Sequence, residues 1–95
     1  MAEIDVRAEG EHEGKLRFVV TVAEAGVAST HEVTLDRSDL ERWSGAADTP
    51  ETFVRRCFEF LLAREPKESI LPRFDVSVIT RYFPEFEGEI RRSAG

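Results

Sequence analysis

Residues 49–86 read TPETFVRRCFEFLLAREPKESILPRFDVSVITRYFPEF and carry seven of the nine aromatic residues of the chain. The run opens with the signals of a helix start. Thr49 can act as the N-cap, Pro50 suits the first helical position, and Glu51 places a negative charge in the first turn. The sequence therefore predicts that a helix begins at residue 50.

Pro66 cannot continue this helix, so we expect the helix to end at residue 64 or 65. At about 100° per residue, its apolar side chains cover about 200° of its surface. They are Phe53, Val54, Cys57, Phe58, Phe60, Leu61 and Leu62. A helix that faces a single neighbour needs only about half that width. We expect a long central helix that packs on a sheet and also against another helix or a second subunit.

The first third of the chain alternates apolar and polar residues, which is the pattern of half-buried strands. Three stretches show it, at residues 3–8, 15–24 and 30–36. The charged segment 9–14 contains two glycines and is typical of a loop, and Ala25–Gly26 is typical of a turn. These short connections predict a three-stranded antiparallel meander with one buried face.

A short helix is expected between the meander and the central helix. Asp36 is its candidate N-cap, and residues 37–44 show helical spacing of apolar side chains. After the central helix, residues 66–74 contain two prolines and read as an extended connection. We expect this connection to tuck Ile70 and Leu71 under the central helix.

The chain should end in a helical segment. Asp75 can cap a third helix whose apolar face carries Val76, Ile79 and Phe83. Pro84 then either ends that helix or opens a last one with Phe86 and Ile90. The predicted fold class is α+β, in a single domain over residues 1–95, with a meander, a short helix, a central helix on one sheet face and a C-terminal helical segment.

The formal net charge is −6, and the acidity lies in the first half of the chain. Residues 1–48 carry 11 acidic and 5 basic residues, whereas residues 49–95 carry 8 of each. This balance disfavours binding to nucleic acid or to anionic membranes, because both require a positive surface field. No signal peptide or membrane-spanning run is recognisable. We expect a cytoplasmic protein without a membrane partner.

Candidate catalytic groups are few. The two histidines each precede a glutamate, in the pairs His12–Glu13 and His31–Glu32, but adjacent strand residues point to opposite faces and cannot chelate one metal ion. We expect both pairs to be solvated at strand ends. Cys57 lies among apolar helix residues and should be a buried, unreactive thiol. The sequence therefore predicts no catalytic residue, no metal and no cofactor.

Arginines on and after the central helix form a candidate anion-binding surface, consisting of Arg55, Arg56 and Arg64. Acidic residues stand four positions from two of them, at Glu51, Glu59 and Glu68, which is the spacing of ion pairs on a helix surface. This spacing favours a solvated face that pairs with itself. Contact with nucleic acid through these arginines is the alternative interpretation.

A second candidate surface is aromatic and lies near the C-terminus, at Arg81, Tyr82, Phe83 and Phe86. One interpretation is that these rings close the edge of the core. The other is that Tyr82 and Phe86 are partly exposed beside Arg81, because aromatic residues and arginine are enriched at interface hot spots. In that case the segment is an interface for a second copy of the chain.

Residues 58–87, FEFLLAREPKESILPRFDVSVITRYFPEFE, resemble a small bacterial protein family whose members are short, single-domain and of unassigned function. The resemblance covers the C-terminal half. It implies a bacterial, cytosolic source and brings no catalytic or binding residues with it.

These observations predict a noncatalytic binding or interaction module whose partner is itself or another protein. A nucleic-acid-associated regulator that uses the arginine-bearing helix face is the alternative, and a small enzyme is third. A homodimer is expected because a chain of 95 residues buries only about 60–65% of its unfolded surface and gains stability from a partner.

Overall fold

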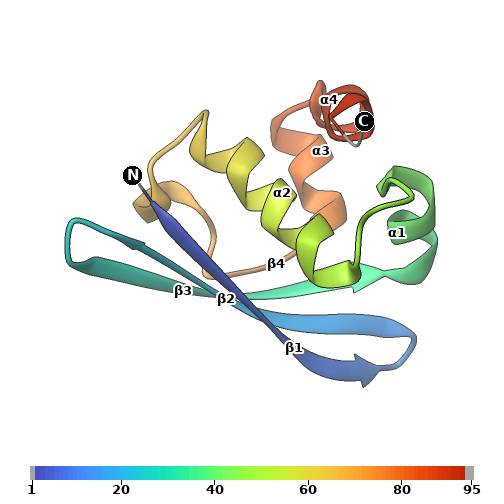
Figure 1. Cartoon of the computed structure of the whole chain (residues 1–95), viewed down its shortest axis with the longest axis horizontal. Helices are drawn as coiled ribbons and strands as arrows, with labels where there is room; N and C mark the ends of the chain where they lie inside the picture. The colour runs from blue at the N-terminus through green and yellow to red at the C-terminus, as the bar shows by residue number, and fades with distance from the viewer. Residues whose placement is uncertain (1, 94–95) are drawn as a thin grey trace.

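The structure is a computed structural model that describes residues 2–93. A four-stranded sheet in the order β1-β2-β3-β4 carries all the helices on one face (Figure 1). The elements are β1 (Glu3–His12), β2 (Lys15–Glu24), β3 (Val27–Asp36), α1 (Arg37–Trp43), α2 (Pro50–Leu62), the 3-10 turn η1 (Lys67–Ser69), β4 (Arg73–Asp75), the 3-10 turn η2 (Val76–Val78), α3 (Ile79–Tyr82) and α4 (Phe86–Arg92). The fold is thus α+β, as predicted.

The antiparallel meander is confirmed, with Ala25–Gly26 as the turn between β2 and β3. The predicted loop over residues 9–14 is wrong, because β1 continues to His12 and pairs it with Lys15. A two-residue turn at Glu13–Gly14, with both φ angles positive, brings the strands together that far. The pairing shifts between Ala8 and Glu11, so the charged end of β1 is strand with exposed side chains on both faces.

The fourth strand was not predicted. β4 is only three residues long and pairs with β3 in parallel, within the segment expected to be an extended connection. Both Ile70 and Leu71 were expected to be buried in that connection, and this prediction is right for one of them. Ile70 is buried, but Leu71 is 42% exposed.

Both helix starts are confirmed, because Asp36 caps α1 and Thr49 caps α2 through side-chain hydrogen bonds. The apolar arc of α2 is buried on two sides. Phe58 lies 5.4 Å from the ring of His31 in β3, and Phe60 lies 5.1 Å from the ring of Phe86 in α4. The central helix therefore joins the sheet to the C-terminal helices, as its width predicted.

The C-terminal segment is more broken than expected. Asp75 caps η2 rather than a longer helix, α3 ends at Tyr82, and α4 begins at Phe86. Within residues 2–93 no helix has the length and apolar character needed to cross a membrane.

Candidate functional site

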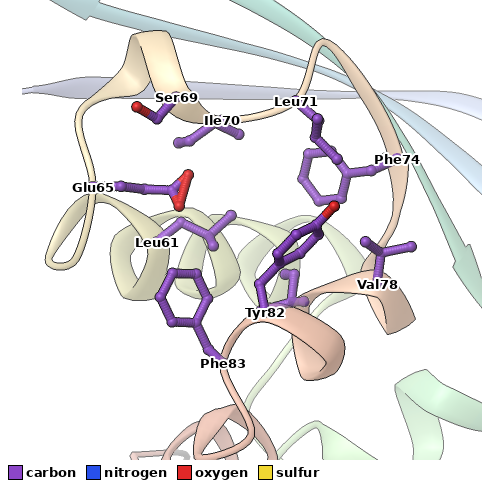
Figure 2. Close-up of a pocket in the computed structure, with 10 residues that line it drawn as sticks. Leu61, Glu65, Ser69, Ile70, Leu71, Phe74, Val78, Tyr82 and Phe83 are labelled. Carbon is purple, nitrogen blue, oxygen red and sulfur yellow. The ribbon is translucent and has the colours of Figure 1, made fainter.

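An apolar pocket of about 130 Å³ opens beside Tyr82, between the end of α2, the η1–β4 connection and α3 (Figure 2). Leu61 and Phe74 form part of its wall, and both belong to the buried core. Leu71 and Tyr82 stand at its rim and are 42% and 65% exposed. Apart from Val27 they are the large hydrophobic residues that residues 2–93 expose, so the pocket lies in the main apolar surface of the described chain.

His31 holds one wall of this pocket in place. Its Nδ1 lies 2.8 Å from the carbonyl oxygen of Leu71, and its Nε2 lies 2.8 Å from Oγ of Ser29. A carbonyl can only accept, so in the neutral ring Nδ1 carries the proton and Nε2 accepts from the serine hydroxyl. The expectation of a solvated histidine is wrong here, because His31 is buried. It is right for His12, which is exposed beside Glu13.

The pocket has one charged residue in its lining, Glu65, and a residue of opposite charge, Arg81, is next to Tyr82 in the chain. Glu65 extends toward the centre of the pocket in Figure 2 and is half-buried. Arg81 precedes Tyr82 on α3 and is exposed. Within residues 2–93, neither side chain forms a hydrogen bond or an ion pair with the rest of the chain. An acidic residue in the pocket and a basic residue on the helix that carries Tyr82 are thus both available to a partner.

The aromatic residues of the predicted interface differ in their exposure. Tyr82 is exposed, and Phe83 is half-buried, lines the pocket and packs edge-on against Phe60 at 5.8 Å. The interface interpretation placed Phe86 partly exposed, but it is fully buried, with ring contacts to Trp43 and Phe60, as in the interpretation that these rings close the core. Phe86 therefore belongs to the core and is not available to a partner.

Sequence analysis did not identify Glu65, Ile70 or Leu71 as part of this site. They lie in the connection after α2, where the sequence has no periodicity that predicts which side chains point to the core. The only signal was the run Ile70–Leu71 between charged residues and a proline, and it does not show which of the two side chains is exposed.

The predicted arginine surface is largely occupied by ion pairs. Nη2 of Arg56 lies 2.5 Å from Oδ2 of Asp48, and its Nη1 donates to the carbonyl oxygen of Ile90 at 2.8 Å. The hydrogen bonds from Arg56 lower the pKa of Asp48 below its ordinary value, against the opposing effect of burial. Arg56 thereby ties α2 to α4.

Arg64 bonds to Glu85 and Glu89, and its guanidinium lies 3.6 Å from the ring centre of Phe60. The expected i,i+4 pairs with Glu51, Glu59 and Glu68 do not form among the described residues. Arg64 follows the end of α2 at Leu62, so the helical spacing to Glu68 does not apply. Arg55 is the member of the predicted set that is exposed and has no ion pair within residues 2–93.

Chemistry at the pocket is limited by its polar groups, which are the carboxylate of Glu65 and the hydroxyls of Ser69 and Tyr82. Cys57 is buried in the core, and this burial raises the pKa of its thiol. Within residues 2–93 no three His, Cys, Asp or Glu side chains are grouped to hold a metal ion. The arrangement is suited to receiving an apolar side chain.

No protein-family model, curated protein or solved structure matches the chain.

Proposed function

We propose that the protein is a noncatalytic interaction module that self-associates through the pocket beside Tyr82. The observation that carries the proposal is the exposure of Tyr82 and Leu71 at the rim of an apolar pocket. Contiguous exposed apolar surface of this kind marks interaction sites in soluble domains. Tyr82 and Phe83 line this pocket, and the exposed Arg81 precedes Tyr82 in α3.

The size of the pocket favours a protein side chain as its occupant. Pockets for small molecules commonly enclose about 300–1,000 Å³. This one measures about 130 Å³, which is less than half of the lower value. A single apolar side chain from a partner fits such a volume, and anchors of that type supply much of the binding energy in protein interfaces.

The surface has the features of a self-complementary patch. It combines a pocket with a protruding aromatic ring, so two copies related by a two-fold axis can each offer a ring to the other. The charges are also complementary across such an axis. Arg81 of each copy can approach Glu65 of the other, and neither residue has an ion pair within the described chain.

Sedimentation equilibrium over micromolar concentrations tests the proposal. We expect the parent to associate reversibly and Tyr82→Ser to weaken association at least about tenfold, as for an interface hot spot. The matched control is Val27→Ser, which removes an exposed apolar side chain (56% exposed) at the β2–β3 hairpin and should leave association unchanged. A parent that stays monomeric at the highest concentration would overturn the proposal.

Charge reversal tests the orientation of the two copies. Arg81→Glu and Glu65→Arg should each weaken association, and the double variant should restore it, because the pair is then re-formed with opposite polarity. Two weak single variants with no rescue would show that these residues do not face each other across the axis.

The alternative function, a nucleic-acid-associated regulator, has less support. Arg56 and Arg64 direct their donors to Asp48, Glu85 and Glu89, and the net charge is −6. Binding of an oligonucleotide with log affinity falling linearly in log salt, and its loss in Arg55→Gln, would favour that function instead.

A further inference from the structure

The sheet ends on one side in an unusually long free edge. Among residues 2–93, β1 spans ten residues and pairs only with β2, whereas β4, at the other edge, has three residues. The outer edge of β1 therefore offers a row of unpaired main-chain groups, and such an edge is a template on which another strand can add.

The pairing pattern shows which groups face outward. The N–H of Glu32 donates to the carbonyl oxygen of Pro72 at 2.8 Å, so the main chain of Glu32 points away from β2. Glu32 lies opposite Val19, and Val19 lies opposite Arg7. Because hydrogen-bonded and non-hydrogen-bonded pairs alternate in antiparallel sheets, the main chain of Val19 faces Arg7. Residues on either side of Arg7 must then point their main chain outward.

Those residues are Val6 and Ala8, and Ile4 follows by the same alternation. The core is incompletely covered along this edge, because Ile4 and Val6 are only half-buried although they pack on the core. A hollow of about 580 Å³ lies beside Ile4, with half-buried Leu62 of α2 in its wall. A strand added to β1 would place alternate side chains over Ile4, Val6 and Leu62.

The edge is also acidic. Glu3 and Asp5 are exposed on the other face of β1, where Arg7 is the one base of the stretch. Glu24, Glu59 and Glu65 line the hollow together with Lys67, whose amine is paired with Glu68. A second copy of the chain would bring these like charges together, which is unfavourable across paired strands. A basic segment would meet charges of opposite sign.

We propose that the stretch Glu3–Ala8 of β1 binds an extended basic segment of another protein as an added strand. The segment alternates apolar residues, which cover Ile4 and Val6, with lysine or arginine, which lie opposite Glu3 and Asp5. The irregular pairing between Ala8 and Glu11 marks the end of this binding stretch. Glu65 lines both this hollow and the pocket beside Tyr82, so the two surfaces adjoin, but Tyr82 and Leu71 do not line the hollow. The inference assigns a second partner to the chain and goes beyond the proposed self-association.

Three blocked peptides of about eight residues test the inference by isothermal titration calorimetry. The first alternates Lys and Val, the second alternates Glu and Val, and the third is the Lys–Val peptide with every amide N-methylated, so that neither of its edges can donate hydrogen bonds. We expect only the first to bind, because the second has the wrong charge and the third cannot form the ladder of main-chain hydrogen bonds. Failure of the first peptide to bind, or equal binding of the methylated one, would overturn the inference.

Variants of the edge locate the site. Glu3→Lys with Asp5→Lys should weaken binding of the Lys–Val peptide about tenfold or more and should improve binding of the Glu–Val peptide. Glu41→Lys with Glu51→Lys is the matched control, since both residues are exposed on helices and the change in net charge is the same. If the control loses as much affinity for the Lys–Val peptide, the peptide responds to the net charge of the protein and not to a site on β1, and the inference is overturned.

Two further measurements separate the inference from the proposed function. Tyr82→Ser should bind the Lys–Val peptide like the parent, although it associates weakly with itself. The Glu3→Lys, Asp5→Lys variant should sediment like the parent. If it instead loses self-association, the edge of β1 is the interface between two copies, and the basic segment is the wrong occupant.

Discussion

Truncation of Phe58 to alanine removes the ring that joins α2 to both β3 and β4. The side chain is fully buried (0% exposed). Its ring centre lies 5.4 Å from that of His31 and 5.9 Å from that of Phe74. The substitution therefore opens a cavity where three elements meet.

Truncation of a buried phenylalanine costs about 3–5 kcal/mol. Domains of this size have a total free energy of unfolding of about 5–15 kcal/mol. An unfolding entropy of about 2 cal/mol/K per residue gives about 0.2 kcal/mol/K for 95 residues. The melting temperature of Phe58→Ala should consequently fall by roughly 15–25 °C.

Scanning calorimetry and urea denaturation, run at one low protein concentration, measure this loss without a contribution from self-association. Phe58→Leu retains most of the volume and should cost only about 1–1.5 kcal/mol. Val27→Ala, at an exposed turn position, should cost less than about 1 kcal/mol. If Phe58→Ala melts within about 5 °C of the parent, Phe58 does not anchor the core and the assigned face of α2 is wrong.

Three other predictions follow from buried polar and ionisable groups. His31→Leu should cost about 1–3 kcal/mol in urea denaturation, because the carbonyl of Leu71 loses its donor; a change below about 0.5 kcal/mol would contradict this role. Cys57 should react with a thiol reagent only on unfolding, since burial raises its pKa, and stoichiometric labelling of the native protein would refute this. Arg56 lowers the pKa of Asp48 in the folded protein. The ionised Asp48 therefore contributes its full stabilisation above its unfolded pKa of about 3.9, and this stabilisation is lost as the pH falls through its lower pKa in the folded state. Urea midpoints between about pH 7 and 3 should therefore fall less steeply in Asp48→Asn than in the parent.

Local signals in the sequence predicted most of the fold. Asp36 and Thr49 cap their helices through bonds to residues two and three positions ahead, so the evidence for each helix start is contained in a few residues. The width of the apolar arc on α2 likewise predicted burial on two sides. Such features depend on propensity and periodicity alone.

The features that were missed depend on contacts between distant residues. β4 is too short to show alternation, and its pairing with β3 is set by where α2 returns the chain. The ion pair of Arg56 with Asp48 joins a residue of α2 to the segment before its N-cap, eight positions apart and outside the i,i+3 and i,i+4 spacing of helix pairs. No pattern within a single element could predict either one.

The candidate site was predicted in part for a similar reason. Tyr82 and Phe86 are four positions apart and would share a face in a continuous helix. Pro84 lies between them, and α3 ends at Tyr82 before α4 begins at Phe86. The change in direction leaves Tyr82 at the surface and turns Phe86 toward Trp43.

The parallel pairing of β4 implies an order of folding. The meander strands meet across two-residue turns, whereas Thr34 and Asp75 are 41 positions apart. Closing so long a segment loses chain entropy before any contact compensates for it, so we expect β4 to dock last. The pocket beside Tyr82 then assembles only in the final step, and a partly synthesised chain cannot offer it to another copy. In pulse-labelled refolding, the amide of Glu32, which donates to Pro72, should gain protection after the amides that pair β2 with β3.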